Sequence, residues 1–223
     1  MSGLIVFDLD GPILEGSHRH YACYSEILEQ FGMKRLPYDV YWVAKRARID
    51  LREILNRSDA GHDYGTFSRL WFERIESARM LAHDRVQPGV REILHACRKA
   101  MIRPVLVTAR RDFRALITQL KKLELRDLFD DILIAPFSEG GKGKASVFYS
   151  KYKEAIPFVR AWIGDTEIDI IAARQLGVTA IALACGLRNR SLLESHLPDY
   201  VFNDIKEAFK NQPLSSLIRI SAS

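Results

Sequence analysis

The most constraining feature of the chain is the stretch Leu4–Gly11, which reads LIVFDLDG. An apolar run that includes Ile, Val and Phe and ends in an acidic, glycine-containing turn is typical of a strand buried on both faces of a parallel sheet. The turn places Asp8 and Asp10 at the carboxyl edge of that strand, where open α/β sheets bind ligands. Carboxylates this close repel each other unless a cation or a shared proton intervenes, so the stretch predicts a metal-assisted phosphate site. The alternative is that both aspartates only end the strand, since Asp and Gly are common turn residues.

Composition narrows the class of protein. The 223 residues are 48% hydrophobic and 27% charged, which is ordinary for a folded protein with a sizeable core. No apolar run approaches the roughly 18 residues that a membrane span needs. Asp8 and Asp10 interrupt the N-terminal run, so we expect no signal peptide and a cytoplasmic location. Cys23, Cys97 and Cys185 lack the spacing of a metal site or a disulfide framework, and we expect buried free thiols.

Positive charge is concentrated in one part of the chain. The net charge is +5, and residues 98–126 carry nine Lys or Arg against the two acids Asp112 and Glu124. Such a stretch attracts anions, but a solvated basic helix face is its commoner meaning. No recognised nucleic-acid motif accompanies it, so we expect no nucleic-acid partner.

Between Gly16 and Asp84 the hydrophobic pattern is helical throughout. Apolar residues at three- and four-residue spacing predict helices over 18–31, 43–55 and 67–81, with a loop at 59–63. No segment in this region resembles a buried strand. We therefore predict an all-helical insert.

Strands and helices alternate in the rest of the chain. Strands are predicted at 104–107, 131–135, 162–163 and 179–183, and helices at 87–100, 112–123, from about 145, and at 169–176. Repeated βα units predict a parallel sheet with right-handed crossovers, which is an α/β fold.

Polar residues follow two of these strands. Thr108 and Ala109 end the strand at 104–107, and a hydroxyl with free N–H groups before a helix suits a phosphate. Asp165 follows the strand at 162–163, and Asp169 opens the next helix, where a carboxylate also favours the positive end of the helix dipole. Helix capping is the alternative for Thr108 and Asp169.

A glycine-rich segment, Gly140–Lys144, precedes another predicted helix. We interpret it as a flexible loop that can bring one ammonium group to an anion. Taken alone, it would more often be a solvated loop.

In this order, the four motifs resemble the haloacid dehalogenase superfamily of phosphotransferases, along nearly the whole chain. The family's first motif matches Asp8–Gly11, the second Thr108, the third Lys142 and the fourth Gly164–Asp169. The resemblance implies a Rossmann-like three-layer core with a parallel sheet and an inserted all-helical cap, as in phosphoglycolate phosphatases and β-phosphoglucomutase. The core would comprise residues 1–15 and 85–223 and the cap residues 16–84, with a shared cleft.

One residue departs from the family pattern. Pro12 stands where the family usually has Thr. Proline lacks an N–H and has a fixed φ, so any donor at this position is lost and the turn toward the cap is altered. We expect the donors nearest the phosphate to precede it, at Leu9 and Asp10.

The resemblance also implies roles for the acidic residues. Asp8 would attack phosphorus to form an aspartyl-phosphate, and Asp10 would protonate the leaving oxygen and then activate water. Mg²⁺ would be held by the Asp8 carboxylate, the Asp10 main-chain carbonyl and Asp165, with Asp169 in support.

Phosphate binding would fall to donors on several strand ends. The resemblance assigns the non-bridging oxygens to Thr108 and Lys142, with the N–H groups of Leu9 and Ala109 beside them. Lys144 is the rival to Lys142, and we prefer Lys142 because the family's similar segments use the first lysine.

The sequence of the predicted cap indicates the substrate less clearly than the four motifs indicate the reaction. Arg48, with Arg46 as a second candidate, lies where related caps contact their substrates and could bind a second anionic group of a small phosphorylated metabolite. A solvated helix face is an equal alternative. The sequence leaves the oligomeric state open.

Other activities of the same superfamily remain alternatives. A phosphomutase would keep the same residues, and a phosphonate hydrolase would need a cap lysine, for which Lys45 is the nearest candidate. A dehalogenase is disfavoured because Asp10 is present. A non-catalytic module that binds an acidic partner is disfavoured by the intact set Asp8, Asp10, Lys142 and Asp165.

Overall fold

The computed structural model describes residues 3–217 and divides into two compact units. One unit is Gly16–Arg85, and the other combines Met1–Glu15 with Val86–Ser223. The boundaries expected from the sequence differ by one residue, Arg85.

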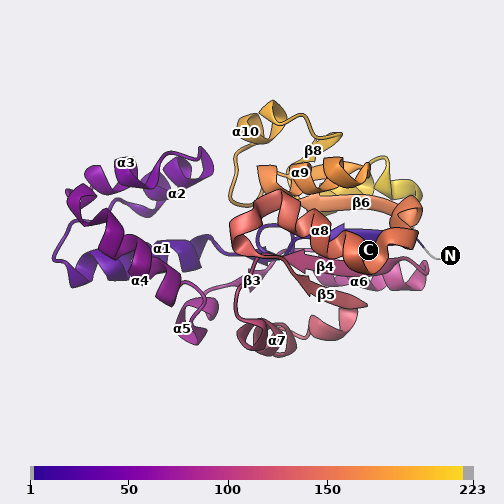
Figure 1. Ribbon diagram of the computed structural model, residues 1–223, viewed down its shortest axis with the longest axis horizontal. Coiled ribbons are helices and arrows are strands. Elements are labelled where there is room, and N and C mark those ends of the chain that lie inside the picture. The colour runs from indigo at the N-terminus through magenta and orange to yellow at the C-terminus, as the bar shows by residue number, and fades with distance from the viewer. Residues whose placement is uncertain (1–2, 218–223) are drawn as a thin grey trace. The chain divides into compact units, whose positions relative to one another are not determined.

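The larger unit contains a six-stranded sheet in which every pair of neighbours is parallel (Figure 1). Its order is β5-β4-β1-β6-β7-β8, and the strands are β1 (Leu4–Phe7), β4 (Arg103–Thr108), β5 (Asp131–Ile134), β6 (Val159–Gly164), β7 (Ala180–Leu183) and β8 (Tyr200–Phe202). This confirms the predicted α/β fold. The order reverses beside β1, and ligands of such sheets bind at that switch point.

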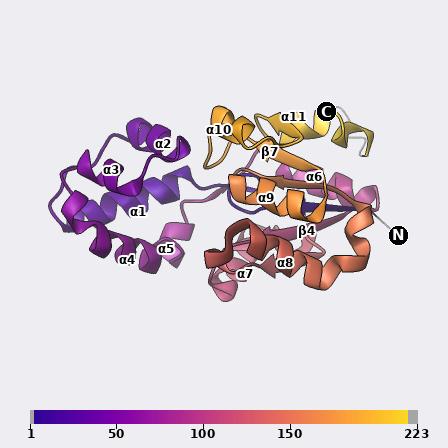
Figure 2. The same cartoon turned by 45° about the horizontal axis from the view of Figure 1, so that its top comes forward.

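Helices cover both faces of the sheet (Figure 2). Leu4 and Val6 pack with α8 (Gly140–Tyr152) and α9 (Glu167–Leu176). Ile5 and Phe7 pack on the opposite face with α6 (Val90–Lys99), α7 (Phe113–Lys122) and α11 (Ile205–Lys210). Because both faces of β1 are buried, its sequence is continuously apolar rather than alternating. A short helix that the sequence did not predict, α10 (Arg190–Ser195), precedes β8.

The smaller unit is helical. Its helices are α1 (Ser17–Gln30), α2 (Tyr38–Arg46), α3 (Leu51–Asn56), α4 (Tyr64–Arg74) and α5 (Ala78–Leu81), with a 3₁₀ turn at Gly61–Asp63. Its core is rich in aromatic rings: Tyr24 stacks on Tyr41 with centroids 4.4 Å apart, and the Tyr24 hydroxyl lies 2.5 Å from the buried Ser58 hydroxyl.

Two helices predicted in this unit are each divided. The prediction at 43–55 is wrong between α2 and α3, because Arg48 adopts a left-handed conformation (φ 57°) and the N–H of Ile49 turns back to the Ala44 carbonyl. The prediction at 67–81 is wrong between α4 and α5. There the Ser77 hydroxyl caps α5 by accepting from the N–H of Met80 at 3.4 Å.

Short paired strands mark where the chain passes between the units. β2 (Leu14–Glu15) and β3 (Arg85–Val86) form a two-stranded sheet. The start and the end of the helical insert are therefore neighbours in space.

Several basic residues of the 98–126 stretch have structural partners. Arg98 donates to the carbonyl of Asp127, Arg126 donates to the carbonyl of Phe129 at 3.3 Å, and Arg103 pairs with Asp130 at 2.8 Å. These three arginines therefore help to hold residues 127–130 in place, although Arg98 is exposed and the Arg103 side chain is 41% exposed.

Two further expectations are tested by burial and helix length. Cys23 and Cys97 are buried free thiols as predicted, whereas Cys185 is only half-buried. Among the described residues, no helix is long and apolar enough to cross a membrane.

Candidate active site

Three strand ends meet at one edge of the sheet. Asp8 follows β1, Thr108 ends β4, and Asp165 follows β6. Because β1 pairs with both β4 and β6, its end lies between theirs, and the N–H of Asp8 donates to the Ile163 carbonyl at 2.8 Å. The sheet therefore brings together the strand-end residues that the sequence singled out.

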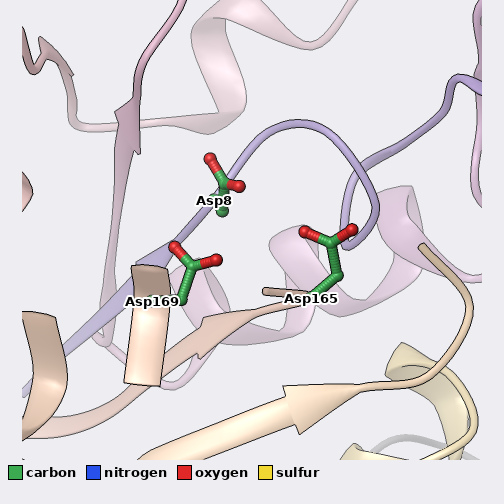
Figure 3. A group of neighbouring side chains, drawn as sticks. All are labelled: Asp8, Asp165 and Asp169. Carbon is green, nitrogen blue, oxygen red and sulfur yellow. The ribbon is translucent and has the colours of Figure 1, made fainter. Parts of the chain in front are cut away.

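Asp8, Asp165 and Asp169 form a buried acidic group (Figure 3). Each offers a carboxylate oxygen, and these oxygens all lie within 4.8 Å of one another. Asp165 Oδ2 accepts from the N–H of Leu187 at 2.5 Å, but its Oδ1 is buried without a hydrogen-bond partner among the described residues. A buried carboxylate oxygen with no donor, facing other acids, fits a cation. The group could therefore bind a metal.

Glycines create the space that Asp165 fills. A Cβ at Gly11 (φ 99°) would lie 2.2 Å from Asp165 Cγ, and a Cβ at Gly186 would lie 1.9 Å from Asp165 Oδ2. Real Cβ atoms do not approach this closely, so only glycine fits at either position while Asp165 keeps its place. The carboxylate is held between two backbone segments.

Lys144 is the ammonium group of the site. Its Nζ lies 2.9 Å from Asp8 Oδ1 and 2.7 Å from Asp169 Oδ1, and its side chain is 3% exposed. The Thr166 hydroxyl donates to the other Asp169 oxygen at 2.8 Å. Asp169 is thus fixed by two donors and holds Lys144 against Asp8.

The structure places Lys142 differently from the sequence-based preference. Lys142 is exposed, and the expected flexible loop is helical because α8 begins at Gly140. Successive helical residues are about 100° apart, so side chains two positions apart point to nearly opposite sides. A Cβ at Gly141 would lie 2.6 Å from the Ile168 carbonyl oxygen. This glycine therefore serves the close approach of α8 to α9, not loop flexibility.

Burial and neighbouring charges shift the pKa values of the group. Burial, with the nearby Asp169 and Asp10, raises the pKa of Asp8 to about 7, although Lys144 opposes the shift. Burial and the charge of Asp8 raise the pKa of Asp165 well above its ordinary value. Burial disfavours the charge of Lys144, but Asp169 and Asp8 outweigh it and raise the Lys144 pKa. An additional cation would reduce the electrostatic repulsion between the carboxylates.

Asp10 lies at the same edge and pairs with Arg110. Arg110 Nε donates to Asp10 Oδ2 at 2.6 Å, and Nη2 donates to Oδ1 at 2.8 Å. The Arg110 backbone N–H donates to the Thr108 hydroxyl oxygen at 3.3 Å. Thr108, the last residue of β4, is buried, and Ala109, which follows it, is half-buried.

The loop after β1 tolerates Pro12. The N–H groups of Ile13 and Leu14 donate to the Leu9 carbonyl at 3.1 and 2.9 Å, and the N–H of Gly11 donates to the Leu14 carbonyl at 2.8 Å. The residues around Pro12 supply the hydrogen bonds of the turn, and Leu9 is fully buried within it.

The residues that were expected to contact the substrate from the cap all lie in the helical unit. Arg48 is exposed at the end of α2, in the left-handed conformation that ends this helix. Arg46 is half-buried, and Lys45 Nζ lies 5.0 Å from the centre of the Trp71 ring. Their roles toward a substrate stay predictions.

Sequence reasoning missed Arg110, Gly186 and the N–H of Leu187. Arg110 was placed directly after Thr108 and Ala109 at a strand end but was given no role, although a positive charge at that position was a usable signal. Gly186 follows the strand 180–183, and a glycine there indicates a close approach of backbone to a ligand or side chain.

Comparisons with known proteins found a matching family model and similar curated proteins. Residues 5–183 match the family model for haloacid dehalogenase-like hydrolases. A phosphoglycolate phosphatase from Neisseria meningitidis is 26% identical over 226 residues, covering 93% of this chain and 92% of that protein. A phosphoglycolate phosphatase from Pseudomonas putida is 23% identical over 213 residues, covering 91% of this chain and 77% of that protein.

The fold is also similar to solved structures. A haloacid dehalogenase-like hydrolase from Streptococcus pneumoniae superposes with a TM-score of 0.73 and 19% identity, covering 94% of this chain and 97% of that one. At this identity the likeness bears on the fold alone.

Proposed function

Since the chain belongs to the haloacid dehalogenase-like hydrolase family, we propose that it is a Mg²⁺-dependent phosphatase acting on a small phosphorylated metabolite through an aspartyl-phosphate on Asp8. The observation that carries this proposal is the buried group at the sheet edge: Asp8 beside Lys144, with an unpartnered oxygen of Asp165 nearby. Phosphate monoesters hydrolyse extremely slowly in water, so a nucleophile, an acid and cations are all needed.

The proposed reaction has two steps. An Asp8 oxygen attacks phosphorus, the bond from phosphorus to the ester oxygen breaks, and Asp10 gives its proton to the departing oxygen. Asp10 then removes a proton from water as the water oxygen attacks the phosphorus of the aspartyl-phosphate. Inorganic phosphate leaves and Asp8 is restored.

Oxygen ligands at the site fit Mg²⁺. The Asp8 carboxylate, the Asp10 main-chain carbonyl and Asp165 would hold the ion, which would supply positive charge toward the phosphoryl oxygens. Both Asp169 oxygens already accept from Lys144 or Thr166. This supports a role for Asp169 in positioning Lys144.

We assign the phosphate-binding ammonium to Lys144 in place of Lys142. Thr108 and the N–H groups of Leu9 and Ala109 would complete the set of donors to the non-bridging oxygens. Lys144→Gln should lower kcat/KM at least 100-fold, as does removal of one transition-state donor elsewhere, whereas Lys142→Gln should stay near wild type. Lys144→Arg tests whether charge alone suffices. Equal effects of the two Gln variants would contradict the assignment.

The names of the relatives direct the choice of substrates. We would assay 2-phosphoglycolate first, then a panel of phosphorylated metabolites and an aryl phosphate, each with Mg²⁺ and with chelator. Phosphate release that requires Mg²⁺ supports the proposal. Migration of the phosphate would indicate a phosphomutase, and neither outcome would indicate a binding module.

Arg48 is proposed to bind a second anionic group of the substrate. Arg48→Ala should then lower kcat/KM for a substrate with a second anionic group by about 1.5–3 kcal/mol, the range for a hydrogen bond to a charged group. Turnover of the aryl phosphate should stay unchanged. Equal losses on both substrates would place Arg48 in the structure of the helical unit alone.

A further inference from the structure

Arg110 has a geometry that the proposed reaction does not yet use. We propose that Arg110 is a positioning residue that fixes the Asp10 carboxylate beside the nucleophile and thereby sets how well the site cleaves esters with poor leaving groups. This inference rests on the proposed function, because it assigns Arg110 to the residue that would transfer the proton.

The contact between the two side chains is bidentate. Nε and Nη2 of Arg110 donate to the two different oxygens of Asp10, at 2.6 and 2.8 Å. Two parallel hydrogen bonds from a planar guanidinium define the plane of a carboxylate as well as its distance. A lysine at this position would supply charge without fixing that plane.

Burial makes Arg110 the fixed partner of the pair. Its side chain is 4% exposed, against 21% for Asp10. The backbone of Arg110 is held at the end of β4 through its hydrogen bond to Thr108, and β4 is paired with β1. Asp10 instead lies in the turn after β1. The better-packed strand end therefore orients a carboxylate that its own turn leaves partly exposed.

Orientation matters for the proposed role of Asp10. Proton transfer to a leaving oxygen requires hydrogen-bond distance and alignment, and small displacements of a catalytic group cost large factors in rate. A guanidinium favours the ionised carboxylate, so one Asp10 oxygen exchanges its Arg110 donor for the transferred proton while the other stays bound to Arg110. A poor leaving group, such as an alkoxide, needs that proton as the bond to phosphorus breaks. A good one, such as a nitrophenolate, needs it far less.

A direct role in phosphate binding is the main competing role for Arg110. Both donors on the edge of the guanidinium that faces Asp10 are engaged by that carboxylate. A phosphoryl group could use the same edge only by displacing Asp10. Lys144, which already lies against Asp8, is the cation better placed for the phosphoryl oxygens.

The test compares leaving groups in Arg110→Lys and Arg110→Gln. We expect kcat/KM for an alkyl phosphate to fall on the order of 10- to 100-fold, a large part of what general acid catalysis contributes. For nitrophenyl phosphate we expect a change of about threefold or less, because kcat/KM includes phosphoryl transfer but not the later hydrolysis of the phosphoenzyme. Arg111→Gln, a substitution at the adjacent arginine, is the matched control and should change neither value.

A double-mutant cycle shows whether Arg110 acts through Asp10. In an Asp10→Asn background, Arg110→Gln should cause little additional loss on the alkyl phosphate, because the two residues act as one unit. Circular dichroism and thermal unfolding would establish that each variant is folded, and Arg110→Lys provides a milder substitution if Arg110→Gln is not.

Other results would overturn the inference. Equal losses on both substrates, together with weaker binding of inorganic phosphate measured by calorimetry, would make Arg110 a phosphate-binding residue. Additive losses in the cycle, or no loss on the alkyl phosphate, would reduce it to a structural ion pair. Turnover of nitrophenyl phosphate by the wild-type protein tests the proposed function separately, so these outcomes overturn only the role of Arg110.

Discussion

Asp165 lies between Gly11 and Gly186, neither of which has a side chain to occupy the space that its carboxylate fills. The position of the Asp165 carboxylate thus depends on two things: the space left by the two glycines and the hydrogen bond from the N–H of Leu187. Residues that orient a metal ligand matter for affinity even when they do not touch the metal.

Gly186→Ala tests this directly. The new Cβ would lie 1.9 Å from Asp165 Oδ2, so the carboxylate must move. We expect Mg²⁺ affinity to fall by about 10- to 100-fold, the usual effect of disturbing residues that support a metal ligand. Calorimetric titration would measure it, with Gly65→Ala as a control, since nothing lies within 4 Å of a Cβ there. Unchanged Mg²⁺ affinity in Gly186→Ala would show that the space at Gly186 is not needed to position the Asp165 carboxylate.

The raised pKa of Asp8 predicts how pH couples to metal binding. Without metal, burial raises this pKa from 3.8 to about 7, so between these values the folded protein holds a proton that the unfolded chain has lost. The contribution of Asp8 to the free energy of unfolding therefore falls as pH rises through this window. A bound cation requires Asp8 in its ionised form, and its positive charge offsets the free-energy cost of burying that charge.

We therefore expect Mg²⁺ to raise the unfolding temperature more at pH 8 than at pH 6. Metal affinity should weaken by about tenfold per pH unit below 7 if one proton is displaced. Differential scanning calorimetry at both pH values, with and without Mg²⁺, measures the shift. The same shift at both would mean that metal binding displaces no proton from Asp8.

Local sequence pattern located some of the residues of the site and could not locate others. Asp8, Thr108 and Asp165 were predictable because each follows an apolar run, and parallel strands bring their carboxyl ends to one edge. The pairing of Arg110 with Asp10 joins residues 100 positions apart. It depends on which strands are neighbours, and no local periodicity carries that information.

At the scale of elements, the start of α8 decides which lysine reaches the site. The glycines at 140–143 indicated a loop, since glycine disfavours helices. Packing against α9 outweighs that preference, because a residue larger than glycine at position 141 would collide with α9. Once the segment is helical, Lys142 and Lys144 must face different ways. Helix propensity could not have predicted this.

Gly141→Ala should therefore harm both stability and activity. The Cβ would lie 2.6 Å from the Ile168 carbonyl oxygen, and overpacking of this kind typically costs about 1–3 kcal/mol of unfolding free energy. Displacement of α8 would also move Lys144 and lower kcat. Urea unfolding and turnover of an aryl phosphate measure the two effects. In α4, Gly65→Ala should instead add about 0.5–1 kcal/mol. A neutral Gly141→Ala would show that α8 can shift freely.

At the scale of the whole molecule, a buried ion pair joins residues near the start and the end of the helical unit. Arg19, in α1, lies 3.0 Å from Asp84 near the end of the unit, with side chains 3% and 0% exposed. Removing one partner of such a pair leaves an uncompensated charge and costs about 3–5 kcal/mol.

Arg19→Met should destabilise the protein by that amount. Arg79→Met is the matched control, since Arg79 pairs with Glu26 at 2.7 Å but is 76% exposed, and such pairs contribute about 1 kcal/mol or less. Denaturant unfolding compares the two. A similar small loss in both variants would show that the buried pair contributes no more than the surface pair.

The pairing of β2 with β3 has a consequence for the order of folding. Leu4 pairs with Arg103, and the whole helical insert separates them along the chain. An unfolded insert would make that contact a long loop closure, whose entropic cost rises with loop length. A folded insert holds its two ends together at β2 and β3, so the loop that must close no longer includes residues 16–84. The helical unit therefore acts as an intramolecular template: when it folds early, the central strand finds its partner faster.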